Sequence, residues 1–136
     1  MADSDRLVLV IDDDEGIREL LSMLIQKEGW RVVTAEDGAE GERKALSLKP
    51  DLIVLDLMLP RYGGFELLKQ LQSTELSRVP IVVVTGRYTD PSTVDMIRRE
   101  SNVVELLEKP VKATRFVLVL QRLLRPAPAA GDAAEA

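Results

Sequence analysis

The chain has 136 residues, enough for a single domain that buries roughly two thirds of its unfolded surface. It contains neither cysteine nor histidine, so disulfides, thiolate nucleophiles and imidazole bases are excluded, and any chemistry must rest on carboxylates, hydroxyls and lysines. The formal net charge of -5 argues against nucleic-acid binding by the domain as a whole, and no apolar run reaches the length of a membrane span. We therefore expect a cytoplasmic protein that binds neither DNA nor membranes directly.

Short apolar runs alternate with segments in which apolar residues have helical spacing. The first run, Leu7–Ile11, is followed from Ile17 to Ile25 by apolar positions at i, i+3, i+4, i+7 and i+8, the pattern of an amphipathic helix. We expect Asp14 to cap this helix, because its short side chain can accept a hydrogen bond from a free backbone amide. Gly29 is expected to end it.

The same alternation continues to residue 124. A second helix opens at Asp37 and ends at Lys49, because the residue before Pro50 is disfavoured in the helical conformation. The further strands are predicted at Arg31–Ala35, Leu52–Asp56, Pro80–Thr85 and Val103–Leu107, and the further helices near residues 65–71, 91–100 and 113–124. Asn102 is expected to take the left-handed conformation that ends the helix before it. This order predicts an α/β fold with a doubly wound five-stranded parallel sheet and five helices.

Polar side chains stand where four of the predicted strands end. Because the carboxyl ends of parallel strands meet at one edge of a sheet, these side chains are expected to converge. They are Asp12, Asp13, Asp56, Thr85 and Lys109. Carboxylate oxygens are the ligands that Mg²⁺ prefers, and two carboxylates about 5 Å apart repel by roughly 3 kcal/mol at an effective dielectric near 20. The three aspartates therefore predict a metal site.

Asp56 is the predicted reactive residue. With a metal beside it and the Lys109 ammonium opposite, its carboxylate can attack phosphorus and form an acyl phosphate. The Thr85 hydroxyl would then donate a hydrogen bond to a phosphoryl oxygen. Taken singly, each feature has a plainer explanation, since an acidic run is often a solvated loop and a strand-end threonine often bonds to backbone. Their combination at one edge favours the reactive site.

This constellation resembles the receiver domains of two-component response regulators, from about Asp5 to Leu124. The resemblance implies a flavodoxin-like fold with strand order 2-1-3-4-5 and Mg²⁺ as the cofactor. It implies that Asp56 accepts a phosphoryl group from a sensor histidine kinase, a phosphotransfer protein or a small phosphodonor. It also implies that the domain is not an enzyme beyond its own phosphorylation and dephosphorylation.

The resemblance further implies roles for single residues. Asp12 and Asp13 match the acidic metal pair, and the backbone carbonyl of Met58 matches a further metal ligand. Thr85 matches the switch hydroxyl, and the lysine matches one that precedes a proline in a cis peptide. Leu106 stands three residues before that lysine, where the family often has an aromatic switch residue.

An enzyme is the alternative hypothesis, as a magnesium-dependent phosphatase or phosphotransferase with an aspartyl nucleophile on a similar sheet. Enzymes of the haloacid dehalogenase type usually have a second aspartate two residues after the first as the general acid. Met58 occupies that position here, which counts against turnover. A nucleotide-binding domain is also disfavoured, because no glycine-rich phosphate loop follows the first strand.

A partner surface is predicted on the helix at 91–100, the strand at 103–107 and the helix at 113–124, because receivers dimerise or contact downstream proteins there. The basic residues of this part are Arg98, Arg99, Lys112, Arg115, Arg122 and Arg125. Leu118 and Val119 add apolar residues outside a single helical stripe, and an exposed apolar strip ringed by charges is typical of an interface. The alternative is a solvated face without a partner.

Residues 126–136 are rich in alanine and proline and lack apolar periodicity. We expect a receiver domain at 1–125 followed by a disordered tail or the first part of a linker. The domain would then act either alone, through protein contacts, or ahead of an effector domain.

Overall fold

The computed structural model describes residues 5–59, 63–86 and 90–124. Its five strands form one parallel sheet in the order β2-β1-β3-β4-β5. The strands are β1 (Leu7–Ile11), β2 (Arg31–Ala35), β3 (Leu52–Asp56), β4 (Ile81–Thr85) and β5 (Val103–Glu108). The helices are α1 (Glu15–Lys27), α2 (Gly38–Leu48), α3 (Gly64–Gln72), α4 (Pro91–Arg98) and α5 (Ala113–Leu124), and a short 3-10 helix, η2 (Glu75–Arg78), precedes β4. The predicted fold class and strand order are confirmed.

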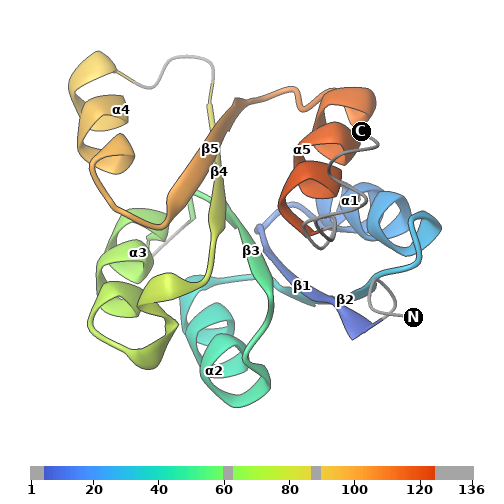
Figure 1. Ribbon diagram of the computed structural model, residues 1–136. Coiled ribbons are helices and arrows are strands. Elements are labelled where there is room, and N and C mark those ends of the chain that lie inside the picture. Colours follow the sequence, from blue (N-terminus) through green and yellow to red (C-terminus); the bar gives the residue numbers. More distant parts are fainter. Residues whose placement is uncertain (1–4, 60–62, 87–89, 125–136) are drawn as a thin grey trace, which may run out of the picture.

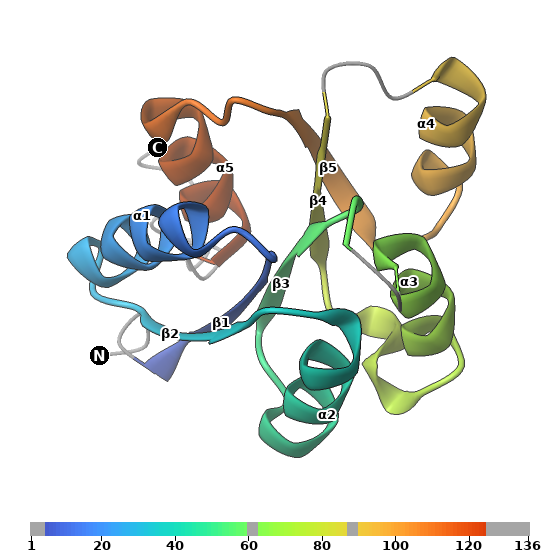
Figure 2. The ribbon, with the colours of Figure 1, turned by 180° about the vertical axis from the view of Figure 1, so that it is seen from behind.

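The sheet lies between two layers of helices (Figures 1 and 2). Helices α1 and α5 cover one face, and α2, α3 and α4 cover the other. Each face has its own apolar core, and strands β1, β3 and β4 are buried along their whole length because both of their faces are covered. The apolar runs of the sequence therefore form the interior of the sheet, and their polar ends lie at its edge.

Capping and helix-ending residues act at the positions that the sequence predicted. The Asp14 carboxylate accepts a hydrogen bond from the Ile17 backbone amide at 3.1 Å and caps α1. Gly29 follows that helix with a φ of 92°, a value that glycine adopts without strain. Lys49, before Pro50, leaves the right-handed helical region and takes a φ of 49°.

The prediction for Asn102 is wrong. Lys49 is the only non-glycine residue with positive φ in the described part of the chain. Asn102 is instead buried, and its side-chain amide donates a hydrogen bond to the Val79 carbonyl at 2.9 Å while its oxygen accepts one from Gln72. Asn102 thus connects the end of α3 to the segments before β4 and β5, a role that depends on residues distant in sequence.

Within the described ranges, the structure holds no helix that combines the length and the apolar character needed to cross a bilayer.

Replacing Asn102 by alanine is expected to lower the free energy of unfolding by about 2 kcal/mol, because it leaves the partly enclosed Val79 carbonyl without its donor. Urea unfolding measures the change. Ser73→Ala is the matched control, since it removes an exposed hydrogen bond to the Gln70 carbonyl and should cost less than about 0.5 kcal/mol. Equal losses in the two variants would show that the Asn102 bridge contributes nothing specific.

Candidate functional site

The parallel register of the central strands brings two aspartates to the same level of the sheet. Ile11, the last residue of β1, pairs with Leu55 of β3. The residues that follow them in the chain, Asp12 and Asp56, therefore both lie at the carboxyl edge of the sheet. Both aspartates are buried, each with only 2% of its surface exposed. Thr85 ends the neighbouring strand β4 and is buried as well. The predicted convergence of these strand ends is thus found in the structure.

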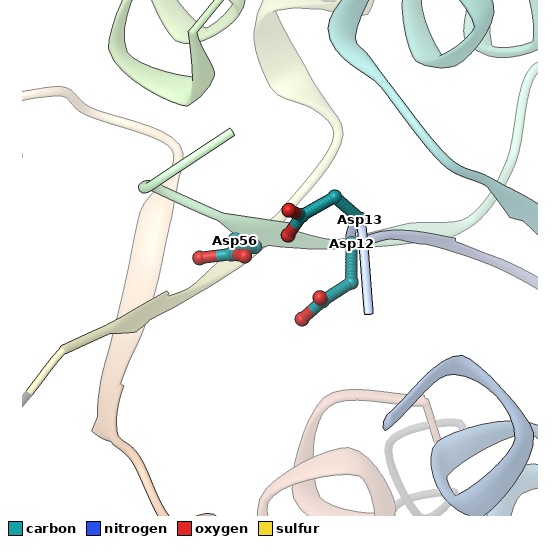
Figure 3. Close-up of side chains that lie close together, drawn as sticks. All are labelled: Asp12, Asp13 and Asp56. Carbon is teal, nitrogen blue, oxygen red and sulfur yellow. The ribbon is translucent and has the colours of Figure 1, made fainter. Parts of the chain in front are cut away.

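Three carboxylates gather at this edge (Figure 3). One oxygen from each of Asp12, Asp13 and Asp56 lies within 4.8 Å of the others. The Lys109 ammonium lies 3.2 Å from Asp56 Oδ2 and 3.4 Å from Asp12 Oδ2. Three negative charges and one positive charge leave a net charge of -2, and all available carboxylate ligands are hard oxygens. The arrangement fits a divalent cation such as Mg²⁺.

Backbone amides fix the orientation of the two buried aspartates. The Asp14 amide donates to Asp12 Oδ1 at 2.9 Å, and the Met58 amide donates to Asp56 Oδ1 at 3.0 Å. In both side chains the second oxygen faces Lys109. Neither carboxylate can therefore turn away from the site without losing a hydrogen bond.

The surroundings of Asp12 and Lys109 raise the pKa values of both side chains. Burial raises the pKa of Asp12, and the nearby Asp56 charge adds to this, while the Asp14 amide and Lys109 act against it. Burial by itself would lower the pKa of Lys109, but the charges of Asp56 and Asp12 and the hydrogen bonds to them prevail, so this pKa is raised. Lys109 is therefore a cation at neutral pH, and the stability that comes from its charge is lost as the pH rises through its raised pKa.

The backbone ties Lys109 to the end of β4. Its amide donates a hydrogen bond to the Thr85 carbonyl at 2.8 Å, and its peptide bond to Pro110 is cis, as expected. Leu106 pairs with Val83 of β4 and packs, partly buried, against the core under α2, α3 and α4. Thr85 and Leu106 thus lie on adjacent strands near the site. Their switch roles, like the role of the Met58 carbonyl as a metal ligand, stay predictions.

Gly64 was not predicted to serve the site. It is the first residue of α3, and a Cβ atom built on it would lie 2.4 Å from the carbonyl oxygen of Asp56 and 2.7 Å from the Cα of Leu57. Only a residue without a side chain lets α3 begin this close to the end of β3. The Gly63-Gly64 pair is visible in the sequence, but the backbone that Gly64 approaches is not.

The comparison with protein families agrees with this geometry. The model of the response regulator receiver domain matches residues 8–121. The chain belongs to this family. The receiver is 34% identical over 131 residues to the alkaline phosphatase synthesis transcriptional regulatory protein PhoP of Bacillus subtilis, with 96% of this chain and 53% of the relative covered. It is 35% identical over 118 residues to the transcriptional regulatory protein AfsQ1 of Streptomyces coelicolor, with 87% and 51% covered.

Comparison with solved structures also identifies receiver proteins as similar to this chain. Chemotaxis protein CheY4 of Vibrio cholerae superposes with a TM-score of 0.79 at 30% identity, covering 88% of the receiver and 99% of that chain. A response regulator receiver protein from Pseudomonas putida has a TM-score of 0.80 at 28% identity, with 87% and 97% covered. Solved receivers are thus matched over nearly their whole length, whereas the chain spans about half the length of the curated relatives it matches.

Replacing Gly64 by alanine is expected to destabilise the receiver by about 1–3 kcal/mol, because the new methyl group collides with the backbone that carries Asp56. Gly63→Ala is the matched control, since its Cβ would lie 3.7 Å from the Leu59 carbonyl oxygen, an ordinary van der Waals distance, and its φ of -70° suits any residue. This control should change stability by less than about 1 kcal/mol. Chemical denaturation compares the two, and a stable Gly64→Ala variant would contradict the close approach.

Without divalent cations, Asp13→Asn is expected to raise the free energy of unfolding by about 1 kcal/mol, because it removes one of three mutually repelling carboxylates. Thermal unfolding in a chelator measures this change. Glu19→Gln, which removes an exposed carboxylate from α1 outside the acidic group, should leave stability nearly unchanged. A destabilised Asp13→Asn variant would show that repulsion in the site is already relieved by other means.

Proposed function

We propose that the receiver accepts a phosphoryl group on Asp56 in a Mg²⁺-dependent reaction. The donor would be a sensor histidine kinase, a phosphotransfer protein or a small phosphodonor. The observation that supports this most directly is a buried carboxylate, 2% exposed, with an ammonium 3.2 Å from one oxygen and two further carboxylates beside it. Such a group has a fixed direction, and the excess negative charge around it needs a cation before an anionic donor can approach.

In this proposal Asp12, Asp13 and Asp56 hold the Mg²⁺ ion together with the backbone carbonyl of Met58. When bound, the ion neutralises charge on the oxygens of the phosphoryl group. The hard carboxylate oxygens and the net charge of -2 in the site support this choice of metal.

The chain's own residues orient and stabilise the transfer. An oxygen of Asp56 forms a bond to phosphorus while the bond from phosphorus to the donor nitrogen or oxygen breaks, and the bonding electrons stay on the donor. The product is an acyl phosphate on Asp56. Lys109, which already contacts this carboxylate, neutralises charge on the phosphoryl oxygens, and the Thr85 hydroxyl donates a hydrogen bond to one of them.

The signal would leave the site through β4 and β5. Movement of Thr85 toward the phosphoryl group changes the space beside Leu106, which lines a cavity of about 400 Å³ with Lys109 and another of about 170 Å³ with Arg98. Rearrangement of Leu106 would then alter the surface formed by α4, β5 and α5. This is the switch that we propose, with leucine in place of a larger ring.

The surface of α4, β5 and α5 is the proposed contact for a second receiver or a downstream protein. Met96 and Val104 are exposed on it at 44% and 39%, and Glu105 forms ion pairs with Arg115 and Arg122. This surface thus carries both exposed apolar side chains and ion-paired charges.

Of the two apolar residues of α5 that were expected to be exposed, only one is. Val119 is buried in the core, because it falls on the sheet-facing side of α5. Leu118 is exposed as expected, and it lines a groove shared with Leu24 of α1. Arg125 lies outside the described residues.

We further propose that the receiver acts in the cytoplasm as a signalling module and turns over no substrate besides its phosphodonor. The relatives named as transcriptional regulatory proteins are about twice as long as the matched region. We therefore propose that phosphorylation is transmitted by protein contact, either to an effector region of the same protein or to a separate partner. The proposed domain is 1–125, and the proposed tail or linker at 126–136 lies outside the described residues.

Incubation with Mg²⁺ and phosphoramidate is expected to add one phosphoryl group to each chain, measured by intact mass. Asp56→Asn should abolish the adduct because it removes the nucleophilic carboxylate, whereas Asp95→Asn, which changes an exposed aspartate on α4, should not. Chelation of Mg²⁺ should slow the reaction strongly. An unchanged adduct in Asp56→Asn would overturn the assignment, and sustained phosphate release from diverse monoesters would favour a phosphatase.

A further inference from the structure

Arg18 reaches from α1 to the backbone of the acidic site. One of its guanidinium nitrogens donates a hydrogen bond to the carbonyl oxygen of Asp12 at 2.7 Å. The other terminal nitrogen lies 3.9 Å from the Glu36 carboxylate, which follows β2. The side chain of Arg18 is only 16% exposed, whereas that of Glu36 is 69% exposed. The short hydrogen bond to Asp12 is therefore the stronger and more sheltered of the two contacts.

This contact fixes a particular peptide group. The Asp12 carbonyl belongs to the peptide that joins Asp12 to Asp13, while the Asp12 amide donates to the Ala35 carbonyl of β2 at 3.0 Å. The backbone on both sides of Asp12 is thus anchored, by the sheet on one side and by Arg18 on the other. Rotation of the Asp12–Asp13 peptide would break the bond to Arg18.

Asp13 depends on this anchor more than the other two aspartates do. Asp12 and Asp56 are each held by a backbone amide and by Lys109. Asp13 is exposed, and among residues 5–59, 63–86 and 90–124 no hydrogen bond or ion pair holds its carboxylate. The place of Asp13 within 4.8 Å of the others is therefore set by the backbone that Arg18 fixes.

We propose that Arg18 is a positioning residue for the divalent cation: it holds the Asp12–Asp13 peptide so that the Asp13 carboxylate faces Asp56. This inference rests on the proposed Mg²⁺ site and adds to it a residue outside the ligand set. Replacing a residue that orients a metal ligand commonly weakens metal binding by 10- to 100-fold.

The sign of the effect separates positioning from simple electrostatics. Arg18 is a cation, so its charge alone opposes the binding of another cation, and its removal would strengthen Mg²⁺ binding. Positioning predicts the reverse, because loss of the anchor lets Asp13 move away. Glu36 provides a matched control, since Glu36→Gln removes the exposed ion pair and leaves the hydrogen bond to Asp12 in place.

The test is Mg²⁺ titration of the full chain by calorimetry, with thermal unfolding in a chelator to check each variant's fold. Arg18→Met, which keeps the length of the side chain, is expected to weaken Mg²⁺ binding about 10- to 100-fold. Glu36→Gln should change it by less than about twofold. Arg18→Lys should bind Mg²⁺ more tightly than Arg18→Met, because its ammonium can still donate to the Asp12 carbonyl. If Arg18→Met does not fold, Arg18→Lys is compared with the native chain in its place.

The outcomes distinguish this inference from the proposed function. If Asp13→Asn loses Mg²⁺ binding while Arg18→Met and Arg18→Lys bind it as tightly as the native chain or more tightly, the metal site stands and the positioning role is overturned. An equal loss in Glu36→Gln and Arg18→Met would also overturn it, since the contact to Asp12 would then be irrelevant. If the native chain itself shows no saturable Mg²⁺ binding, both proposals fail.

Discussion

Three like charges are held close together at the carboxyl edge of the sheet, and the surrounding residues keep them there. Two of the three carboxylates are buried, and each is held by a backbone amide on one oxygen and by Lys109 on the other. Two such charges about 5 Å apart repel by roughly 3 kcal/mol at an effective dielectric near 20, and the two ion pairs of Lys109 offset much of this repulsion. Lys109 balances only one of the three negative charges, so the site still favours a bound cation.

The sheet supplies the rigidity that such a site needs. Strands β1 and β3 are buried on both faces, and their register sets Asp12 and Asp56 side by side before any side-chain contact is made. Two further residues then fix the backbone at this edge. Gly64 lets α3 begin against the end of β3, and Arg18 holds the peptide after Asp12. The positions of Asp12 and Asp56 are thus set mainly by the backbone.

The same edge provides a physical link from the site to the surface. The Lys109 amide is bonded to the Thr85 carbonyl, so the residue that contacts Asp56 is also joined to the end of β4. Leu106 is partly buried and lines two pockets at this end of the sheet. Coupling of this kind requires an element with two discrete arrangements, and in the proposed function the region around Leu106 is that element.

The order of the elements, the fold class and the meeting of Asp12, Asp56 and Lys109 could be predicted from the sequence. Hydrophobic periodicity and helix caps are local, and the convergence of strand ends follows from the geometry of parallel strands. The sequence did not predict the role of Asn102, the burial of Val119 or the contacts of Gly64 and Arg18. Each of these depends on atoms distant in the chain, brought near by packing. A local sequence pattern indicates the secondary structure and burial that a residue favours, but it does not indicate which distant backbone group the residue will contact.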